Sequence, residues 1–144
     1  MPTSSNKPPR RAPSGEIAVR TERRTQLLDV TAAIAKMVQD SGVHSGVCYV
    51  YVPHTTAGVI INENADPDVA ADIESALARL VPKESAYRHA EGNSDSHIKA
   101  ALVGTSATIL ISGGELELGR WQGIFFCEFD GPRTRRLRVK ILPE

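Results

Sequence analysis

The segment His54 to Asp68, HTTAGVIINENADPD, places polar side chains on both sides of a short apolar run, Val59 to Ile61. Imidazole, hydroxyl and amide groups donate hydrogen bonds to a phosphate, whereas a carboxylate or an imidazole can bind a divalent metal. The groups before the run are His54, Thr55 and Thr56, and the groups after it are Asn62, Glu63 and Asn64. We predict that the run forms a stiff strand that holds ligand-binding groups at both of its ends.

Three of the four histidines, His54, His89 and His97, lie among Asn, Asp, Glu, Ser and Thr residues. Such imidazoles bind metals, transfer protons or hold a phosphate, although any one of them can equally be a loop or capping residue. The spacing of eight between His89 and His97 is not the i, i+4 spacing of a helical zinc pair, so a metal site needs ligands from several loops. We predict one ligand site with His54 and His97, and with His89 as a third member, that binds a divalent metal such as Zn²⁺ or Mg²⁺.

Two carboxylates have both a structural and a functional interpretation. Glu63, at the end of the predicted strand, is either a surface carboxylate or a ligand-binding group. Glu128 interrupts the apolar run FFCEF, so it lies either on a solvated face or inward beside a partner. The segment GRWQG adds Trp121 and Gln122 between glycines, and Lys99 adds a cation close to His97. The periodicity of the sequence does not decide between the two interpretations of either carboxylate.

Length and composition limit the class of protein. A chain of 144 residues corresponds to one domain, and its 17 basic and 17 acidic residues give a formal net charge of zero. The chain as a whole therefore has no electrostatic bias toward nucleic acid or an anionic membrane, and any anion site must be local. Cys48 and Cys127 lie in separate apolar runs, which is typical of buried thiols in a cytoplasmic protein. We find no signal peptide and no apolar run near the roughly 20 residues that span a bilayer.

Helical signals are clearest after Asp66, which can cap a helix whose first position suits Pro67. Apolar residues then recur at helical spacing up to Pro82. An earlier helix has Thr31 as its hydroxyl cap and Gly42 as its end. Helices are expected over residues 31–42, from residue 67 up to Pro82, and over residues 96–104.

Most of the remaining chain has the composition of β-strands. The strands 47–52 and 58–63, joined by a short HTTA link, are expected to be neighbours. We expect residues 1–14 to form a disordered tail and residues 15–144 to form a single compact α+β domain with largely antiparallel or mixed sheets and about three helices. Strands are expected over residues 16–21, 47–52, 58–63, 107–112, 123–129 and 135–142, with a turn and a short strand within 113–119.

Three motifs occur in order along the chain: HTTAGVIINENADPDV, YRHAEGNSDSHIKAALVGTS and LGRWQGIFFCEFDG. In this combination the sequence resembles the YjbQ family, described as secondary thiamine-phosphate synthase enzymes, from about Glu16 to the C-terminus. The resemblance implies an α+β domain that assembles as a homotrimer, with polar motif residues near subunit boundaries. The chain departs from the family pattern at Arg120, where a threonine is usual, which places a long cation beside Trp121.

The activity implied by the resemblance joins a pyrimidine methyl diphosphate to a thiazole phosphate and releases pyrophosphate. Two alternatives use the same pocket: a metal- or phosphate-ligand-binding protein without this physiological activity, and a metal-assisted hydrolase of a small phosphorylated or amide substrate. The sequence has no G-x-x-x-x-G-K-[ST] loop, and no nucleotide cofactor is expected. The expected catalytic residues are His54, Glu63 and His97, and the expected substrate-binding residues are Thr55, Thr56, Asn62, Asn64, Lys99, Trp121, Gln122 and Glu128.

Overall fold

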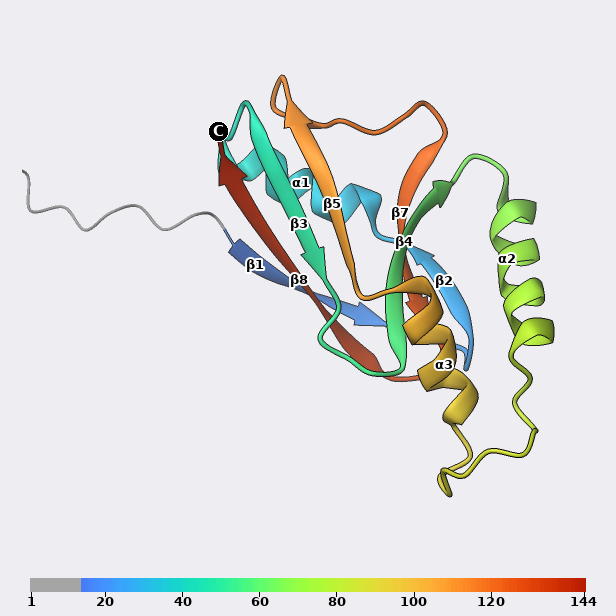
Figure 1. Ribbon diagram of the computed structural model, residues 1–144. Helices are drawn as coiled ribbons and strands as arrows, with labels where there is room; N and C mark the ends of the chain where they lie inside the picture. Colours follow the sequence, from blue (N-terminus) through green and yellow to red (C-terminus); the bar gives the residue numbers. More distant parts are fainter. Residues whose placement is uncertain (1–13) are drawn as a thin grey trace, which may run out of the picture.

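The computed structural model describes residues 14–144, which fold into two antiparallel sheets and three helices (Figure 1). The predicted tail over residues 1–14 lies outside the described residues, except that Ser14 is the first residue of β1. The strands are β1 Ser14–Arg20, β2 Gln26–Asp29, β3 Gly46–Tyr51, β4 Ala57–Glu63, β5 Ser106–Ser112, β6 Glu115–Leu116, β7 Gln122–Glu128 and β8 Thr134–Pro143. The helices are α1 Thr31–Ser41, α2 Pro67–Leu80 and α3 Ser94–Val103.

The five-stranded sheet has the order β1-β8-β3-β5-β6, and the three-stranded sheet has the order β2-β7-β4. Each pair of neighbouring strands is antiparallel. The expected α+β class with three helices is confirmed, and the sheets are antiparallel rather than mixed.

β3 and β4, which we expected to be neighbours, are not adjacent strands of one sheet. β3 lies between β8 and β5 in one sheet, whereas β4 pairs with β7 in the other sheet. The HTTA link is therefore a crossover between two layers and not a hairpin turn. Both strands have apolar residues on their inner faces, Val50 on β3 and Val59 on β4, and both side chains are buried in one core. Two strands that face each other across a core and two strands that pair in a sheet have the same apolar pattern, so the sequence did not distinguish them.

The core lies between the two sheets because side chains alternate across each strand. Along β8, exposed and buried residues alternate from Thr134 to Ile141, so Leu137 and Val139 point inward. The three-stranded sheet contributes Phe126 from β7, which is fully buried. Helix α1 adds Ile34 to the same cluster. Burying each of these side chains stabilises the fold by roughly 1.5–3 kcal/mol.

Helix α1 ends as predicted but begins differently. Gly42 has a left-handed backbone with φ of 70°, which suits a glycine after a helix. Thr31, the predicted cap, is instead the first helical residue, and its backbone N–H donates to Asp29 Oδ1 at 2.9 Å. The Thr31 hydroxyl accepts a hydrogen bond from the backbone N–H of Ile124 at 2.8 Å. This hydroxyl thus joins α1 to β7.

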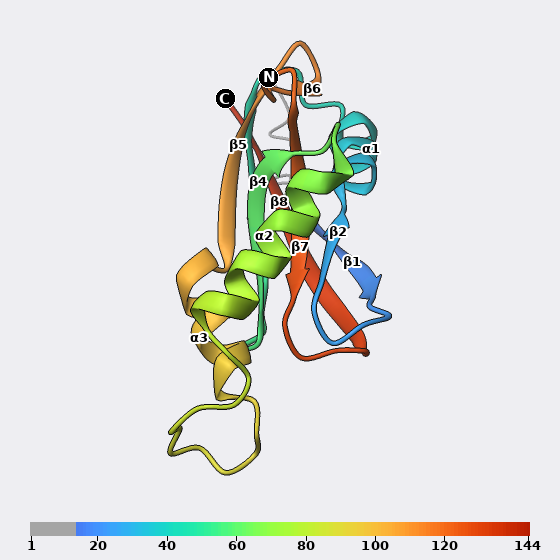
Figure 2. The ribbon, with the colours of Figure 1, turned by 90° about the vertical axis from the view of Figure 1, so that its right-hand side faces the viewer.

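Helix α2 follows the predicted signals, since Asp66 accepts a hydrogen bond from the Asp68 N–H at 2.9 Å and Pro67 is at the first turn. It lies over the outer side of the three-stranded sheet (Figure 2). None of its residues is buried in the single chain, and Leu80 at its end is 74% exposed. Within residues 14–144, no helix is both long and apolar enough to cross a membrane.

Candidate functional site

Glu128 is fully buried at the end of β7, where it pairs with Arg135 of β8. Arg135 Nε donates to Glu128 Oε1 at 2.9 Å, and the Thr21 hydroxyl donates to the same oxygen at 2.8 Å. The backbone N–H groups of Phe129 and Asp130 donate to Oε2, each at 3.1 Å. Burial would raise the pKa of Glu128, but the hydrogen bonds from Arg135 and Thr21 lower it. The inward interpretation of Glu128 is therefore the right one, and both of its oxygens accept hydrogen bonds from the protein itself.

Arg135 also binds the start of β4. Its Nη2 donates to the Thr56 hydroxyl at 2.8 Å and to the Thr56 carbonyl at 3.3 Å. Thr56 is buried and belongs to this network, whereas Thr55 beside it is exposed. Of the two predicted hydroxyls, Thr55 is the one that a ligand can reach.

His54, in the β3–β4 link, is half-buried, and its Nε2 accepts a hydrogen bond from the Arg136 N–H at 2.9 Å. Burial and the nearby Arg135 guanidinium lower the pKa of His54. A neutral imidazole that accepts at Nε2 has its proton on Nδ1. In this arrangement His54 can donate a hydrogen bond from Nδ1, but it has no nitrogen lone pair free for a metal.

A second buried charge cluster lies under helix α3. Asp95, fully buried in the first turn, accepts hydrogen bonds from both terminal nitrogens of Arg24 at 2.9 and 3.0 Å. Lys99, four residues later on the same helix, donates to Asp95 Oδ2 at 3.0 Å and is itself buried. Lys99, which we predicted to bind substrate, therefore pairs with an internal carboxylate. Two cations thus neutralise the Asp95 carboxylate, and the carboxylates of Asp130 and Glu84 also act on Arg24.

His89 and His97 lie together at the start of α3. Their rings make a T-shaped contact with centroids 5.6 Å apart. Both rings line a cavity of about 390 Å³, which we call the α3 cavity. Its lining residues are Tyr87, Arg88, His89, Ser94, His97 and Ile98. His89 also lies 3.5 Å from the exposed carboxylate of Glu91.

The structure brings together two of the three predicted metal ligands. Within residues 14–144, no three His, Cys, Asp or Glu side chains are grouped as metal ligands. His54 does not join His89 and His97 in such a group, and its Nε2 is already an acceptor. The predicted set of three imidazoles therefore does not fit a metal, because Nε2 of His54 already accepts a hydrogen bond and His54 is not grouped with the other two.

A second group of predicted residues lies where β4 ends and β7 begins, away from His54 and Thr56: Asn62, Glu63, Asn64, Trp121 and Gln122. We call this region the Glu63 end. Three of their amide groups bind locally: Asn62 Oδ1 accepts from the Glu63 N–H, Asn64 Nδ2 donates to Asp29, and Gln122 Oε1 accepts from the Gly119 N–H. These contacts stabilise the turns that follow β4 and precede β7. The side chain of Glu63 takes part in none of these contacts and is half-buried.

Trp121 is 54% exposed at the Glu63 end, and the Arg120 guanidinium lies 5.1 Å from its ring centroid. This distance is within the range of a cation–π contact. The long cation that departs from the family pattern thus covers the indole ring instead of lying free.

The two groups of predicted residues are separated by the length of β4. Glu63 follows Thr56 by seven residue steps, which is about 24 Å for an extended strand. Helix α3 packs on the other end of β4, since its last turn reaches Gly58 through the Gly104 carbonyl. His97 and Glu63, both predicted to be catalytic, therefore cannot meet in one chain.

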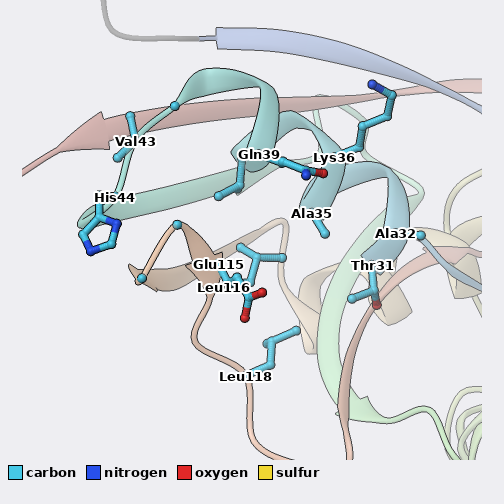
Figure 3. Close-up of a pocket in the computed structure, with 14 residues that line it drawn as sticks. Thr31, Ala32, Ala35, Lys36, Gln39, Val43, His44, Glu115, Leu116 and Leu118 are labelled. Atoms are coloured by element: carbon cyan, nitrogen blue, oxygen red, sulfur yellow. The ribbon is translucent and has the colours of Figure 1, made fainter.

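A further groove lies between α1 and the β5–β6 turn (Figure 3). Its volume is about 770 Å³, and its polar lining side chains include Lys36, Gln39, His44 and Glu115. None of the predicted site residues lines it.

Asp95, Arg24 and Arg135 were not among the residues predicted from the sequence. Two signals were available, since Asp95 and Lys99 have the i, i+4 spacing of a helical ion pair and Glu128 in an apolar run requires a cation. No spacing rule identifies Arg135 or Arg24 as those cations, because each comes from another part of the chain.

The sequence matches the family described as UPF0047 protein YjbQ-like over residues 15–144. The UPF0047 protein of Methanocaldococcus jannaschii is 53% identical over 124 residues, which cover 86% of this chain and 90% of that protein. The UPF0047 protein YugU of Bacillus subtilis is 44% identical over 127 residues, which cover 88% of this chain and 96% of that protein.

Solved structures have the same fold. The crystal structure of a YjbQ/UPF0047 family protein of Clostridium acetobutylicum superposes with a TM-score of 0.87 at 52% identity, covering 88% of this chain and 98% of that chain. A YbjQ-like protein of Sulfolobus solfataricus superposes with a TM-score of 0.88 at 31% identity, covering 91% of this chain and 96% of that chain.

The Asp95 cluster gives a prediction about acid stability. Burial would raise the pKa of Asp95, but the hydrogen bonds from Arg24 and Lys99 lower it from 3.8 to about 2. The ionised carboxylate thus stabilises the fold above about pH 4, and this contribution of about 2 kcal/mol is lost as the pH falls toward 2. Urea unfolding between pH 5 and pH 2 should show a steeper loss of stability for the native protein than for Asp95→Asn. Carbon NMR titration of the Asp95 carboxyl is the direct measurement, and a midpoint near 4 would contradict the prediction.

Proposed function

The chain belongs to the family described as UPF0047 protein YjbQ-like, as its three motifs predicted, and from this premise we propose that it is a transferase of low efficiency. The reaction joins a pyrimidine methyl diphosphate to a thiazole phosphate, releases pyrophosphate and forms thiamine phosphate. Departure of pyrophosphate leaves an electrophilic methylene. The site must therefore offer hydrogen-bond donors and positive charge to phosphate groups, more than a nucleophile.

The donor set of the α3 cavity is the observation that carries this proposal. Arg88, His89, Ser94 and His97 line the cavity, and none of its six lining residues is acidic. Helix α3 begins here, and the N-terminus of a helix favours an anion. Behind it, the buried Asp95 carboxylate is paired with Arg24 and Lys99, so its charge does not oppose the binding of an anion. A diphosphate is the leaving group that suits this environment, with His97 as a donor to its oxygens.

The proposed assembly is a homotrimer whose site is shared between subunits. Glu63 and His97 lie too far apart to act together within one chain, so a shared site takes them from two subunits. The single chain also exposes large apolar side chains on the helices, Leu80 on α2 and Leu102 on α3, at 74% and 62%. Exposed apolar surface of this kind favours association with another copy.

The proposed location is the cytoplasm. Cys48 and Cys127 are both buried free thiols, which suits a reducing compartment. Burial raises the pKa of the Cys48 thiol to about 11 and that of Cys127 to about 12. Neither thiol is therefore a nucleophile at neutral pH.

A second candidate function is the binding of a phosphorylated ligand without catalysis. It is favoured by the internal contacts of Glu128, Lys99 and Thr56, which leave few of the predicted residues free to take part in a reaction. An assay with both thiamine precursors separates the two functions. Formation of thiamine phosphate supports the transferase, whereas pyrophosphate binding without product supports the ligand-binding protein.

Replacement of His97 by Ala tests the role of the α3 cavity. Loss of one donor to the leaving group should lower the rate of thiamine-phosphate formation by about 10²-fold and weaken pyrophosphate binding. The free energy of unfolding should change by only about 0.5 kcal/mol, because His97 is a helix-start residue outside the core. His44→Ala in the α1 groove is the matched control and should leave rate and binding unchanged. An unchanged rate in His97→Ala, or a large loss of stability, would show that the imidazole is structural.

Replacement of Glu63 by Gln tests whether the site is shared. This change removes a charge but little volume, so it should abolish activity without changing the melting temperature. Co-expression of the Glu63→Gln and His97→Ala chains should restore about a quarter of the activity, because some sites then receive both intact residues from different subunits. Light scattering of the native protein should give a trimer mass. A monomer mass at micromolar concentration, or mixed chains that stay inactive, would contradict the shared site.

A further inference from the structure

The outer face of the five-stranded sheet carries aromatic and basic side chains in adjacent rows. Tyr49 and Tyr51 are two residues apart on β3, so both point to one side, and they are 43% and 51% exposed. On the neighbouring strand β8, Lys140 is directly opposite Tyr49 and Arg138 is directly opposite Tyr51. Arg136 continues the row of cations on β8. We call these five residues the Tyr-Arg face.

The Tyr-Arg face is accessible in the described chain. All five of its side chains line one cavity of about 500 Å³. Figure 1 shows β3 and β8 side by side with α1 behind the sheet, while α2 and α3 lie beyond β4. The alternation along β8 explains this arrangement, since Leu137 and Val139 enter the core and the basic residues between them point outward.

Positive charge is concentrated on this side of the molecule. The outward residues of β1 and β8 include four cations, Arg20, Arg136, Arg138 and Lys140, against one carboxylate, Glu16. Glu16 lies 3.6 Å from Arg136 and 3.8 Å from Arg138, so it neutralises only part of the row. The two strands thus present a net charge of +3 on a chain whose total is zero. The expectation that nucleic acid is not a partner rested on that total and not on the distribution of charge.

The sequence before Ser14 is also basic. It contains Lys7, Arg10 and Arg11 and no acidic residue. Ser14 is paired in register with Lys140, so the basic segment joins the domain at the edge of the Tyr-Arg face.

We propose that the Tyr-Arg face binds single-stranded nucleic acid. Tyr49 and Tyr51 are about 6.8 Å apart along the strand, which is twice the 3.4 Å step between stacked bases of a duplex strand. Two tyrosines at this spacing can each stack on one unstacked base, which a single strand offers and a duplex does not.

The row of cations on β8 has the same spacing of about 6.8 Å and lies one strand, about 4.8 Å, from the tyrosines. The phosphates of a single strand therefore lie over β8 while its bases lie over β3. On the other side of β3, Thr108 is opposite Tyr49 and Ser106 is opposite Tyr51, and both place hydroxyls near the base edges. A single strand of nucleic acid would contact all three rows of side chains, with its bases on the tyrosines and hydroxyls and its phosphates on the cations. None of these residues lines the α3 cavity, so the two sites are distinct.

Fluorescence anisotropy with the full chain and a labelled oligouridylate of about 12 nucleotides tests the proposal. Three phosphate contacts predict that the logarithm of the binding constant falls with the logarithm of the salt concentration with a slope of about −2. Arg138→Ala should reduce this slope by about 0.7. Arg79→Ala on α2 is the matched control and should leave affinity and slope unchanged.

The tyrosines supply the second arm of the experiment. Tyr49→Ala and Tyr51→Ala should each weaken binding at least about fivefold, whereas Tyr49→Phe and Tyr51→Phe should bind like the native protein because they keep the stacking ring. A duplex of the same length should bind more weakly than the single strand. Absence of binding at low salt, equal binding of duplex and single strand, or native affinity in the two alanine variants would overturn the proposal. If a tyrosine-to-alanine variant fails to fold, the salt dependence of binding by Arg138→Ala tests the proposal instead, and an unchanged slope would overturn it.

Discussion

The buried ion pair between Glu128 and Arg135 joins the two sheets. The position of helix α3 and of the residues around its start depends on this pair. Removing two charges from water costs several kcal/mol for each, so such a pair persists only where further hydrogen bonds complete it. Here Thr21 follows β1 and Thr56 precedes β4, and both supply those bonds. Four strands from two layers thus converge on one carboxylate and one guanidinium. The pair requires a single relative placement of the sheets, because any sliding would leave buried charges without partners.

This constraint extends to the candidate site through the neighbours of the pair. Arg136, next to Arg135, holds His54 through its backbone N–H and points its own side chain to the outer face of the sheet. Phe129, next to Glu128, accepts a hydrogen bond from the Ser96 hydroxyl, which attaches the start of α3 to the end of β7. The His54 link, the α3 cavity and the Tyr-Arg face are therefore positioned by residues adjacent to the same ion pair. Along β8, the buried residues thus contribute to the interior of the domain, while the exposed residues between them form a basic surface.

Much of the fold was predictable because its signals are local. The cap at Asp66, the proline after it and the alternation along β8 each depend on residues close together in sequence. The relation of β3 to β4 was not predictable, since packing across a core and pairing in a sheet require the same apolar pattern. The inward orientation of the Glu128 side chain and the partners of Asp95 could not be predicted either, because they depend on residues far away in the sequence. Arg24 lies 71 residues before Asp95, and no periodicity connects residues that far apart.

The sequence proposed a set of site residues, but it did not predict how those residues lie relative to one another. His89 and His97 do lie together, yet the segment that first suggested a site, His54 to Asp68, has its two polar groups at opposite ends of β4. A strand positions its ends rigidly but keeps them apart, so both groups can serve one ligand only across subunits. In the Tyr-Arg face, by contrast, residues that are far apart in the sequence are brought together by the fold. Its residues are visible in the sequence as two short alternating runs, but only strand order makes them neighbours.

Urea unfolding of Glu128 and Arg135 variants tests most directly whether this pair holds the domain together. Glu128→Gln leaves Arg135 without its buried counter-charge and should lower the free energy of unfolding by about 3–5 kcal/mol, as should Arg135→Met. The double variant Glu128→Leu with Arg135→Met should be considerably more stable than the sum of the two single losses implies. If Glu128→Gln instead kept native stability while thiamine-phosphate formation or pyrophosphate binding was lost, Glu128 would be a substrate-binding residue and the structural role of the pair would be contradicted.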